Sequence, residues 1–217
     1  MLSWDHNAYY HRAILRRLPA HSARVLEVGS GRGHLAVRLA ERADEVDALD
    51  LDPAMVEATR AIVPANVRCR RADVTTAELP AGCYDAVVTL SVLHHLDLAT
   101  ALPLLARALR PGGVLVAVAL PKSDLPRELP VEAAASLVHH VLGTVFTAVR
   151  HPYRVGLPHP THPGAVPMKD PTLTTRQVRD VARTALPGAD VRRLLLWRYL
   201  LTWTKPSAAT ATSPTSA

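Results

Sequence analysis

The chain has 217 residues, 48% hydrophobic and 20% charged, a balance that fits one globular domain with a sizeable core. Its two cysteines, Cys69 and Cys83, are too few for a disulfide framework, and the first residues lack the apolar run of a secretory signal. A cytoplasmic location is therefore expected. The net charge of +6 comes mainly from scattered arginines without interleaved aromatic residues, which disfavours nucleic acid as a partner.

The chain begins with an amphipathic pattern that predicts a helix over residues 7–18, ended by Pro19. Aromatic and titratable side chains gather in residues 4–11, although only 4% of the chain is aromatic. They include His6, Tyr9 and Tyr10.

A glycine-rich segment follows a short aliphatic run at residues 25–28, which is typical of a buried parallel strand. Gly29, Gly31 and Gly33 then precede a predicted helix over about residues 34–42, whose free N–H groups can hold a polar ligand. A dinucleotide fingerprint would read G-x-G-x-x-G, and here the third glycine comes one residue early. Glu27 stands two residues before the first glycine and suits a cation better than a pyrophosphate.

Alternating strands and helices continue to about residue 120. Helices predicted near 34–42, 54–61 and 98–110 separate strands near 24–28, 46–50, 66–70, 85–90 and 114–119. This alternation predicts right-handed crossovers and a parallel sheet covered on both faces. Asp50 ends the second strand, and Asp52 is the predicted N-cap of a helix that opens with Pro53.

Five features in order resemble the class I S-adenosylmethionine-dependent methyltransferases over about residues 22–120. They are the Glu27 glycine segment, the acid Asp50, the segment 71–74 with Asp73, the segment 84–96, and the turn at residues 111–113. The resemblance implies an α/β fold with a Rossmann-like seven-stranded sheet. It also implies S-adenosylmethionine as cofactor and S-adenosylhomocysteine as product.

The same resemblance implies roles for particular residues. Asp50 would accept hydrogen bonds from both ribose hydroxyls, Asp73 would receive the adenine amino group, and Val74 would cover the ring. Glu27 and the backbone near Gly29 and Leu90 would hold the methionine part. The full set of implied cofactor-binding residues is Glu27, Gly29, Ser30, Gly31, Gly33, Asp50, Leu51, Asp73, Val74 and Leu90.

His94 and His95 follow the fourth predicted strand, where the carboxyl ends of strands form the ligand crevice. One of them is the candidate general base; the alternative is a helix-start and packing role for the pair. The family's N-terminal helix often closes over cofactor and acceptor, so His6, Tyr9 or Tyr10 would contact substrate. The alternative is a surface helix that its aromatic side chains hold in place.

The alternation stops after residue 120, and residues 121–171 are predicted to form a helical, proline-rich cap inserted after the fifth strand. Its apolar stretch, residues 131–149, is interrupted by Glu132 and two histidines, so a cap helix or dimer face is favoured over a membrane span. A last helix over 174–186 and a hairpin of strands 190–197 and 198–204 would close the sheet. One methyltransferase domain is thus expected over 1–204 (N-terminal helix 1–21, core 22–120, cap 121–171, closing elements 172–204), with a disordered tail at 205–217.

No metal site is expected, because His139, His140, His151, His159 and His162 lack acidic or cysteine companions in a closed pattern. The cap favours a small-molecule acceptor methylated on an O, N or C atom, such as specialised metabolism uses, in a monomer or homodimer. An RNA methyltransferase and a non-catalytic S-adenosylmethionine-binding protein stay open as alternatives. An NAD-dependent oxidoreductase is disfavoured by the glycine spacing.

Overall fold

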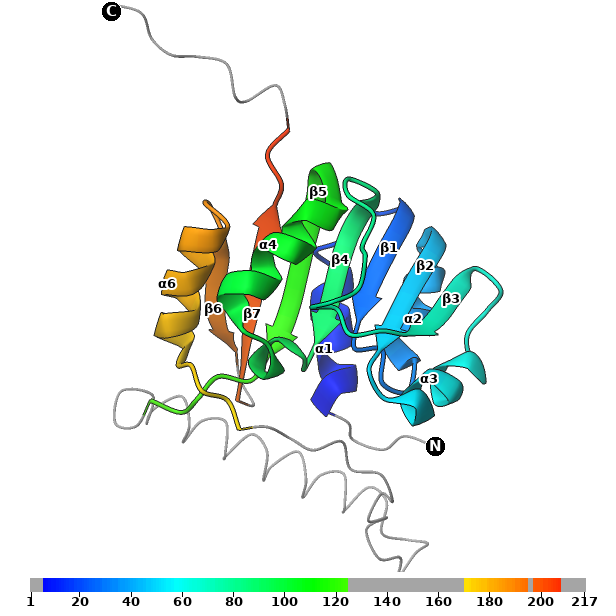
Figure 1. The fold of residues 1–217 in the computed structure, drawn as a ribbon, viewed down its shortest axis with the longest axis horizontal. Coiled ribbons are helices and arrows are strands. Elements are labelled where there is room, and N and C mark those ends of the chain that lie inside the picture. Colours follow the sequence, from blue (N-terminus) through cyan, green and yellow to red (C-terminus); the bar gives the residue numbers. More distant parts are fainter. Residues whose placement is uncertain (1–5, 125–169, 195–196, 208–217) are drawn as a thin grey trace, which may run out of the picture.

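The computed structural model describes residues 6–124, 170–194 and 197–207. In this part of the chain, seven strands form one sheet in the order β3-β2-β1-β4-β5-β7-β6 (Figure 1). The strands are β1 Ser22–Val28, β2 Ala43–Asp50, β3 Val67–Arg71, β4 Tyr84–Leu90, β5 Leu109–Ala119, β6 Asp190–Leu194 and β7 Arg198–Thr204. Strands β1 to β5 pair in parallel, and β7 runs antiparallel to both β5 and β6. The predicted seven-stranded α/β sheet with a closing hairpin is confirmed.

Helices cover both faces of this sheet (Figure 1). They are α1 His6–Leu15, α2 His34–Ala40, α3 Pro53–Arg60, α4 Leu98–Ala108 and α6 Thr175–Ala185, with a short 3-10 turn η1 at Leu93–His95. Helices α4 and α6 pack together on one face, and α1 packs beside α2 on the other. Each face has its own hydrophobic cluster, so the central strands are buried on both sides, as their aliphatic sequences predict.

The predicted helix starts agree with the observed caps. The Asp52 side chain accepts a hydrogen bond from the Ala54 N–H at 2.8 Å, with Pro53 as the first residue of α3. Asp97 caps α4 in the same way. Thr174 and Gln177 form a reciprocal capping box at the start of α6.

Three predicted boundaries are wrong. The predicted turn at residues 111–113 lies inside β5, which begins at Leu109, and α4 ends at Ala108 rather than at 110. The Gly112 N–H donates to the Lys205 carbonyl, and the Lys205 N–H donates to the Gly113 carbonyl, both at 2.8 Å, so contacts with the end of β7 extend the strand. Helix α1 ends three residues early, at Leu15, because the Arg17 N–H bonds to the Ile14 carbonyl in a tighter turn.

The parallel strands place the segments that follow β1, β2, β4 and β5 at one edge of the sheet (Figure 1). The described residues leave out most of the predicted cap, including its helix at 131–149 and its histidines. They also leave out residues 208–217. None of the described helices is long and apolar enough to cross a membrane.

Candidate functional site

The glycine loop connects β1 to α2 through three residues with left-handed backbone. Gly29, Gly31 and Gly33 have φ values of 76°, 54° and 77°, which side chains other than glycine adopt at a cost. A Cβ on Gly29 would also lie 2.1 Å from Cγ2 of Val92, which follows β4. The loop is anchored to β2, because the N–H groups of Gly29 and Ser30 both donate to the Leu49 carbonyl.

Asp50, the last residue of β2, connects three segments of this edge. Its Oδ2 accepts from the Gly31 N–H at 2.7 Å, and its Oδ1 accepts from the Asp52 N–H at 2.9 Å. Its carbonyl accepts from the Ala72 N–H at 2.9 Å, which fixes the segment after β3. Each carboxylate oxygen keeps a second lone pair, so the group can still accept from a ligand diol.

Glu27 lies one residue before the end of β1 and is 2% exposed. Its Oε2 has no hydrogen-bond partner in the described part of the chain. Burial raises the pKa of this carboxyl well above its usual value, and the charge of Asp50 raises that pKa further. A buried carboxyl without a partner fits a ligand that brings a cation or a hydrogen-bond donor.

The other predicted adenine-side residues lie beside Asp50. Leu51 is 62% exposed, an unusual position for a large apolar side chain. Asp73 is exposed, and its Oδ1 accepts from the N–H and hydroxyl of Thr75, which lower the pKa of Asp73. The side chain of Val74 is buried in the hydrophobic cluster of the α4 and α6 face.

The segment after β4 carries the two candidate base residues. Leu90 ends the strand opposite Val118 of β5, and Ser91 has a left-handed φ of 61° before η1 begins. The rings of His94 and His95 lie 4.0 Å apart between centroids. Burial, then the charges of His95 and Arg198, lower the pKa of His94 to about 4.

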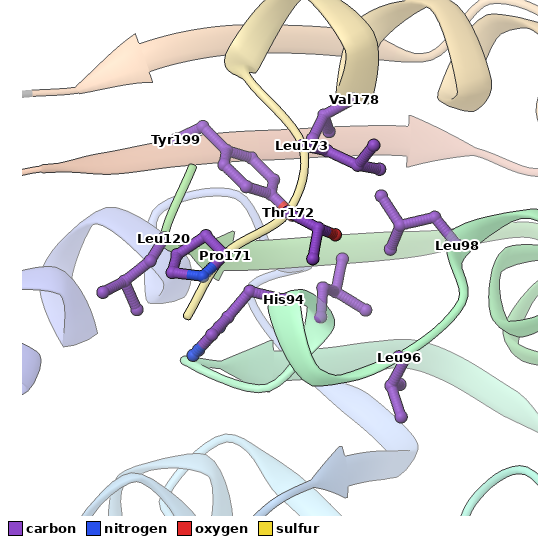
Figure 2. A pocket seen from close by; sticks show the side chains of 10 residues that line it. His94, Leu96, Leu98, Leu120, Pro171, Thr172, Leu173, Val178 and Tyr199 are labelled. Carbon is purple, nitrogen blue, oxygen red and sulfur yellow. The ribbon is translucent and has the colours of Figure 1, made fainter. Parts of the chain in front are cut away.

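His94 borders a small depression with mainly aliphatic walls (Figure 2). Its volume is about 10 Å³, room for about one water-sized group. The other lining residues are Leu93, Leu96, Leu98, Leu120, Pro171, Thr172, Leu173, Val178 and Tyr199.

The predicted substrate contacts on α1 lie in different environments. Tyr9 is 50% exposed, whereas Tyr10 is 2% exposed and packs into the hydrophobic cluster with Ile14. The two rings meet edge to face with centroids 5.1 Å apart. Burial raises the pKa of Tyr10 to about 12. The side chain of His6 lies outside the described residues.

Comparisons with known proteins agree with this architecture. A family model described as a methyltransferase domain matches residues 25–113. An uncharacterized methyltransferase of Mycobacterium tuberculosis is 35% identical over 206 residues, which cover 94% of this chain and 98% of that protein. The chain belongs to the class I S-adenosylmethionine-dependent methyltransferases. The ubiquinone biosynthesis O-methyltransferase of Xylella fastidiosa is 34% identical over 108 residues, 47% of this methyltransferase and 44% of that enzyme.

Solved structures share the fold of this methyltransferase at low sequence identity. An S-adenosylmethionine-dependent methyltransferase from Mesorhizobium loti aligns with a TM-score of 0.60 at 18% identity, covering 89% of this chain and 96% of the other. The [4+2]-cyclase SpnF aligns with a TM-score of 0.65 at 15% identity, covering 95% and 85%. At these identities the likeness shows the fold alone.

Sequence reasoning missed three residues that lie at or beside the candidate site. Thr59 of α3 is fully buried, and its Oγ1 donates to the Gly31 carbonyl at 2.9 Å. This bond attaches the glycine loop to α3. A polar residue on the buried face of a helix was the available signal. Val92 and Tyr199 carry no such signal, because each lies in an aliphatic or aromatic run that is typical of core.

Proposed function

We propose that the methyltransferase transfers a methyl group from S-adenosylmethionine to a small-molecule acceptor, and that the glycine loop, Asp50 and Glu27 hold the cofactor. The observation that supports the cofactor site is the buried Glu27 carboxyl, one strand away from Asp50, whose Oε2 has no hydrogen-bond partner among the described residues. The methionine part of the cofactor carries an ammonium and a sulfonium, and a buried carboxylate favours both. Gly29, Ser30, Gly31, Gly33 and Leu90 supply backbone around that part in the proposed site.

The remaining proposed cofactor contacts come from residues at the same edge of the sheet. Asp50 accepts from the two ribose hydroxyls through the lone pairs that its backbone contacts leave. Asp73 and Val74 lie on the adenine side, where the Asp73 carboxylate accepts from the amino group. The exposed side chain of Leu51 offers an apolar surface for the flat ring.

When bound, S-adenosylmethionine supplies an electrophilic methyl group, and the residues of the chain position the acceptor atom in line with it. His95 is the proposed general base for an acceptor that must lose a proton. His94 is the weaker candidate, because a ring with a pKa of about 4 holds a proton poorly at neutral pH. Its neutral ring suits a hydrogen bond instead. His95→Ala should lower turnover and leave cofactor affinity unchanged; unchanged turnover would exclude His95 as the base.

The depression beside His94 favours an apolar contact with a small acceptor, because its walls are mainly aliphatic and include no lysine or arginine among the described residues. The net charge of +6 favours RNA as acceptor. Part of that charge is engaged in ion pairs within the fold, since several arginines contact acidic side chains: Arg24, Arg60, Arg68, Arg110 and Arg192.

The acceptor class can be tested with S-adenosylmethionine that carries a deuterated methyl group. The protein is incubated with a dialysed low-mass metabolite extract or with total RNA, and the mass gain is followed in each. A gain confined to the metabolite extract is the expected result. A gain in RNA that weakens steeply with salt would favour the RNA alternative instead.

The cytoplasmic location and the monomeric or homodimeric state stay predictions from the sequence. The division into N-terminal helix, core, cap and closing elements is likewise our proposal. The role of Tyr9 and His6 as substrate contacts is tested by deletion of residues 1–12, since full activity of the truncated protein would exclude it. For Tyr10 the burial of the ring supports the alternative, a residue that holds α1 on the sheet.

A further inference from the structure

Tyr199 of β7 is a buried tyrosine beside the end of β5. Its side chain is 1% exposed, and its Oη has no hydrogen-bond partner among the described residues. A buried hydroxyl without a partner costs free energy, and such groups in native proteins are uncommon. Tyr84, a second buried tyrosine, shows the usual arrangement, because its hydroxyl donates to Asp47 at 2.8 Å.

Tyr199 lies at the same edge of the sheet as the candidate site. It lies opposite Ala119 of β5, one residue before Leu120, at the edge where β4 and β5 end. The Lys122 N–H donates to the Leu173 carbonyl at 2.8 Å, which holds the segment before α6 over this end of β5. Figure 2 shows the ring of Tyr199 extending from β7 toward Thr172 of that segment.

The ring of His94 brings a second polar atom to the same depression. Its Nδ1 is buried and has no hydrogen-bond partner in the part of the chain that the structure describes. Tyr199 and His94 both line the depression, while most of the other walls are aliphatic. A phenol O–H donates, and the unprotonated nitrogen of a neutral imidazole accepts.

We propose that Tyr199 and His94 form the polar subsite that receives the oxygen of a neutral hydroxyl group on the acceptor. This inference rests on the proposed small-molecule function and names the chemistry of the acceptor. The hydroxyl accepts from the Tyr199 phenol or donates to His94 Nδ1, and the depression has room for about one oxygen-sized group. The rest of an apolar molecule then contacts the aliphatic wall. Tyr199 acts as a specificity-determining residue, because an acceptor without oxygen leaves both polar atoms unpaired.

The probes are phenol and toluene, which have nearly the same shape and differ in the hydroxyl. Binding is measured by NMR with S-adenosylhomocysteine present, following the Nδ1 resonance of His94. Phenol should shift this resonance in the wild-type protein and toluene should not. Tyr199→Phe should weaken phenol binding by about 2- to 10-fold, the range for one hydrogen bond, and leave toluene binding unchanged.

The melting temperature distinguishes a ligand-binding hydroxyl from one that stabilises the fold, because loss of a stabilising hydroxyl would lower it. Tyr199→Phe should melt at the same temperature as the wild type or higher, because it removes a buried hydroxyl without a partner. The matched variant Tyr84→Phe should melt lower, since it loses the bond to Asp47. A lower melting temperature for Tyr199→Phe would show that the hydroxyl serves the fold.

Three results would contradict the subsite. The first is equal phenol affinity in wild type and Tyr199→Phe, and the second is that Tyr199→Phe loses as much affinity for toluene as for phenol. The third is a His94 resonance that phenol does not shift. The affinity for S-adenosylhomocysteine is measured in the same samples and should be equal in both proteins. Failure of that binding in the wild type would contradict the proposed function itself. Normal binding without phenol discrimination would contradict the Tyr199 and His94 subsite alone.

Discussion

The carboxylate of Asp50 accepts a hydrogen bond from the backbone N–H of Gly31 at 2.7 Å, which joins the end of β2 to the glycine loop after β1. Its other oxygen accepts from the Asp52 N–H. In the proposed site, the same side chain shapes the loop and accepts hydrogen bonds from the ribose. The proposed site therefore couples the shape of the loop to cofactor binding at this residue.

Asp50→Asn should weaken the binding of S-adenosylhomocysteine by about 10-fold or more, because charged hydrogen bonds contribute about 1.5–3 kcal/mol. The amide keeps one acceptor oxygen but replaces the other with a donor, which opposes a backbone N–H. Asp52→Asn is the matched control, since asparagine is also a good N-cap for α3. Equal affinities of the two variants in calorimetry would contradict a ribose role for Asp50.

Gly29→Ala should destabilise the protein more than Gly188→Ala. Both glycines have positive φ, 76° and 85°, so each alanine adds about 1–2 kcal/mol of backbone strain. Only at Gly29 would the new methyl meet Val92, at 2.1 Å, which adds about 1–3 kcal/mol of overpacking. Urea unfolding measures both variants. Similar losses would mean that Val92 moves aside without cost.

Glu27→Gln should stabilise the protein without cofactor above the ordinary pKa of glutamate. Below 4.5 the carboxyl is protonated in both folded and unfolded chains and costs little. As the pH rises, the unfolded chain ionises while burial keeps the folded carboxyl protonated, so wild-type stability falls by about 1.4 kcal/mol per pH unit until the folded pKa is reached.

The gap between Glu27→Gln and wild type should therefore be larger at about pH 8 than at about pH 5 in thermal unfolding. Glu57→Gln provides the control, because Glu57 is exposed on α3 and pairs with Arg60 at 2.6 Å. If the wild type is more stable than Glu27→Gln at both pH values, burial does not destabilise the Glu27 carboxylate as proposed.

His94 should make the protein sensitive to mild acid. Its folded pKa of about 4 lies below the ordinary 6.5, mainly because the ring is partly buried and secondly because His95 lies beside it. As the pH falls from 6.5 toward 4, the unfolded chain binds a proton that the folded ring does not, so stability decreases across this window. His94→Gln should reduce the slope of stability against pH there. An unchanged slope would show that the ring is protonated in the folded state.

Local sequence signals predicted much of this edge because they act within a few residues. The glycines need left-handed backbone, Asp52 and Thr174 satisfy free N–H groups of a first helical turn, and the alternation of elements predicts the sheet.

Other features depend on segments that are distant in the chain. The start of β5 at Leu109 depends on contacts with Lys205, and residues 111–113 alone resemble a turn. The environment of the Tyr199 hydroxyl depends on how η1 and residues 171–173 pack against β7. The pattern of residues 198–204 does not encode this packing. Tertiary contacts therefore decide the shape of the proposed acceptor side of the site.

The most direct test of the cofactor site is the affinity of S-adenosylhomocysteine for wild type, Glu27→Gln and Glu57→Gln, measured by titration calorimetry at neutral pH. The proposed site predicts binding to the wild type, a loss of about 10-fold or more in Glu27→Gln, and wild-type affinity in Glu57→Gln. Equal binding by all three proteins would contradict the assignment of the buried Glu27 carboxyl to the methionine part of the cofactor.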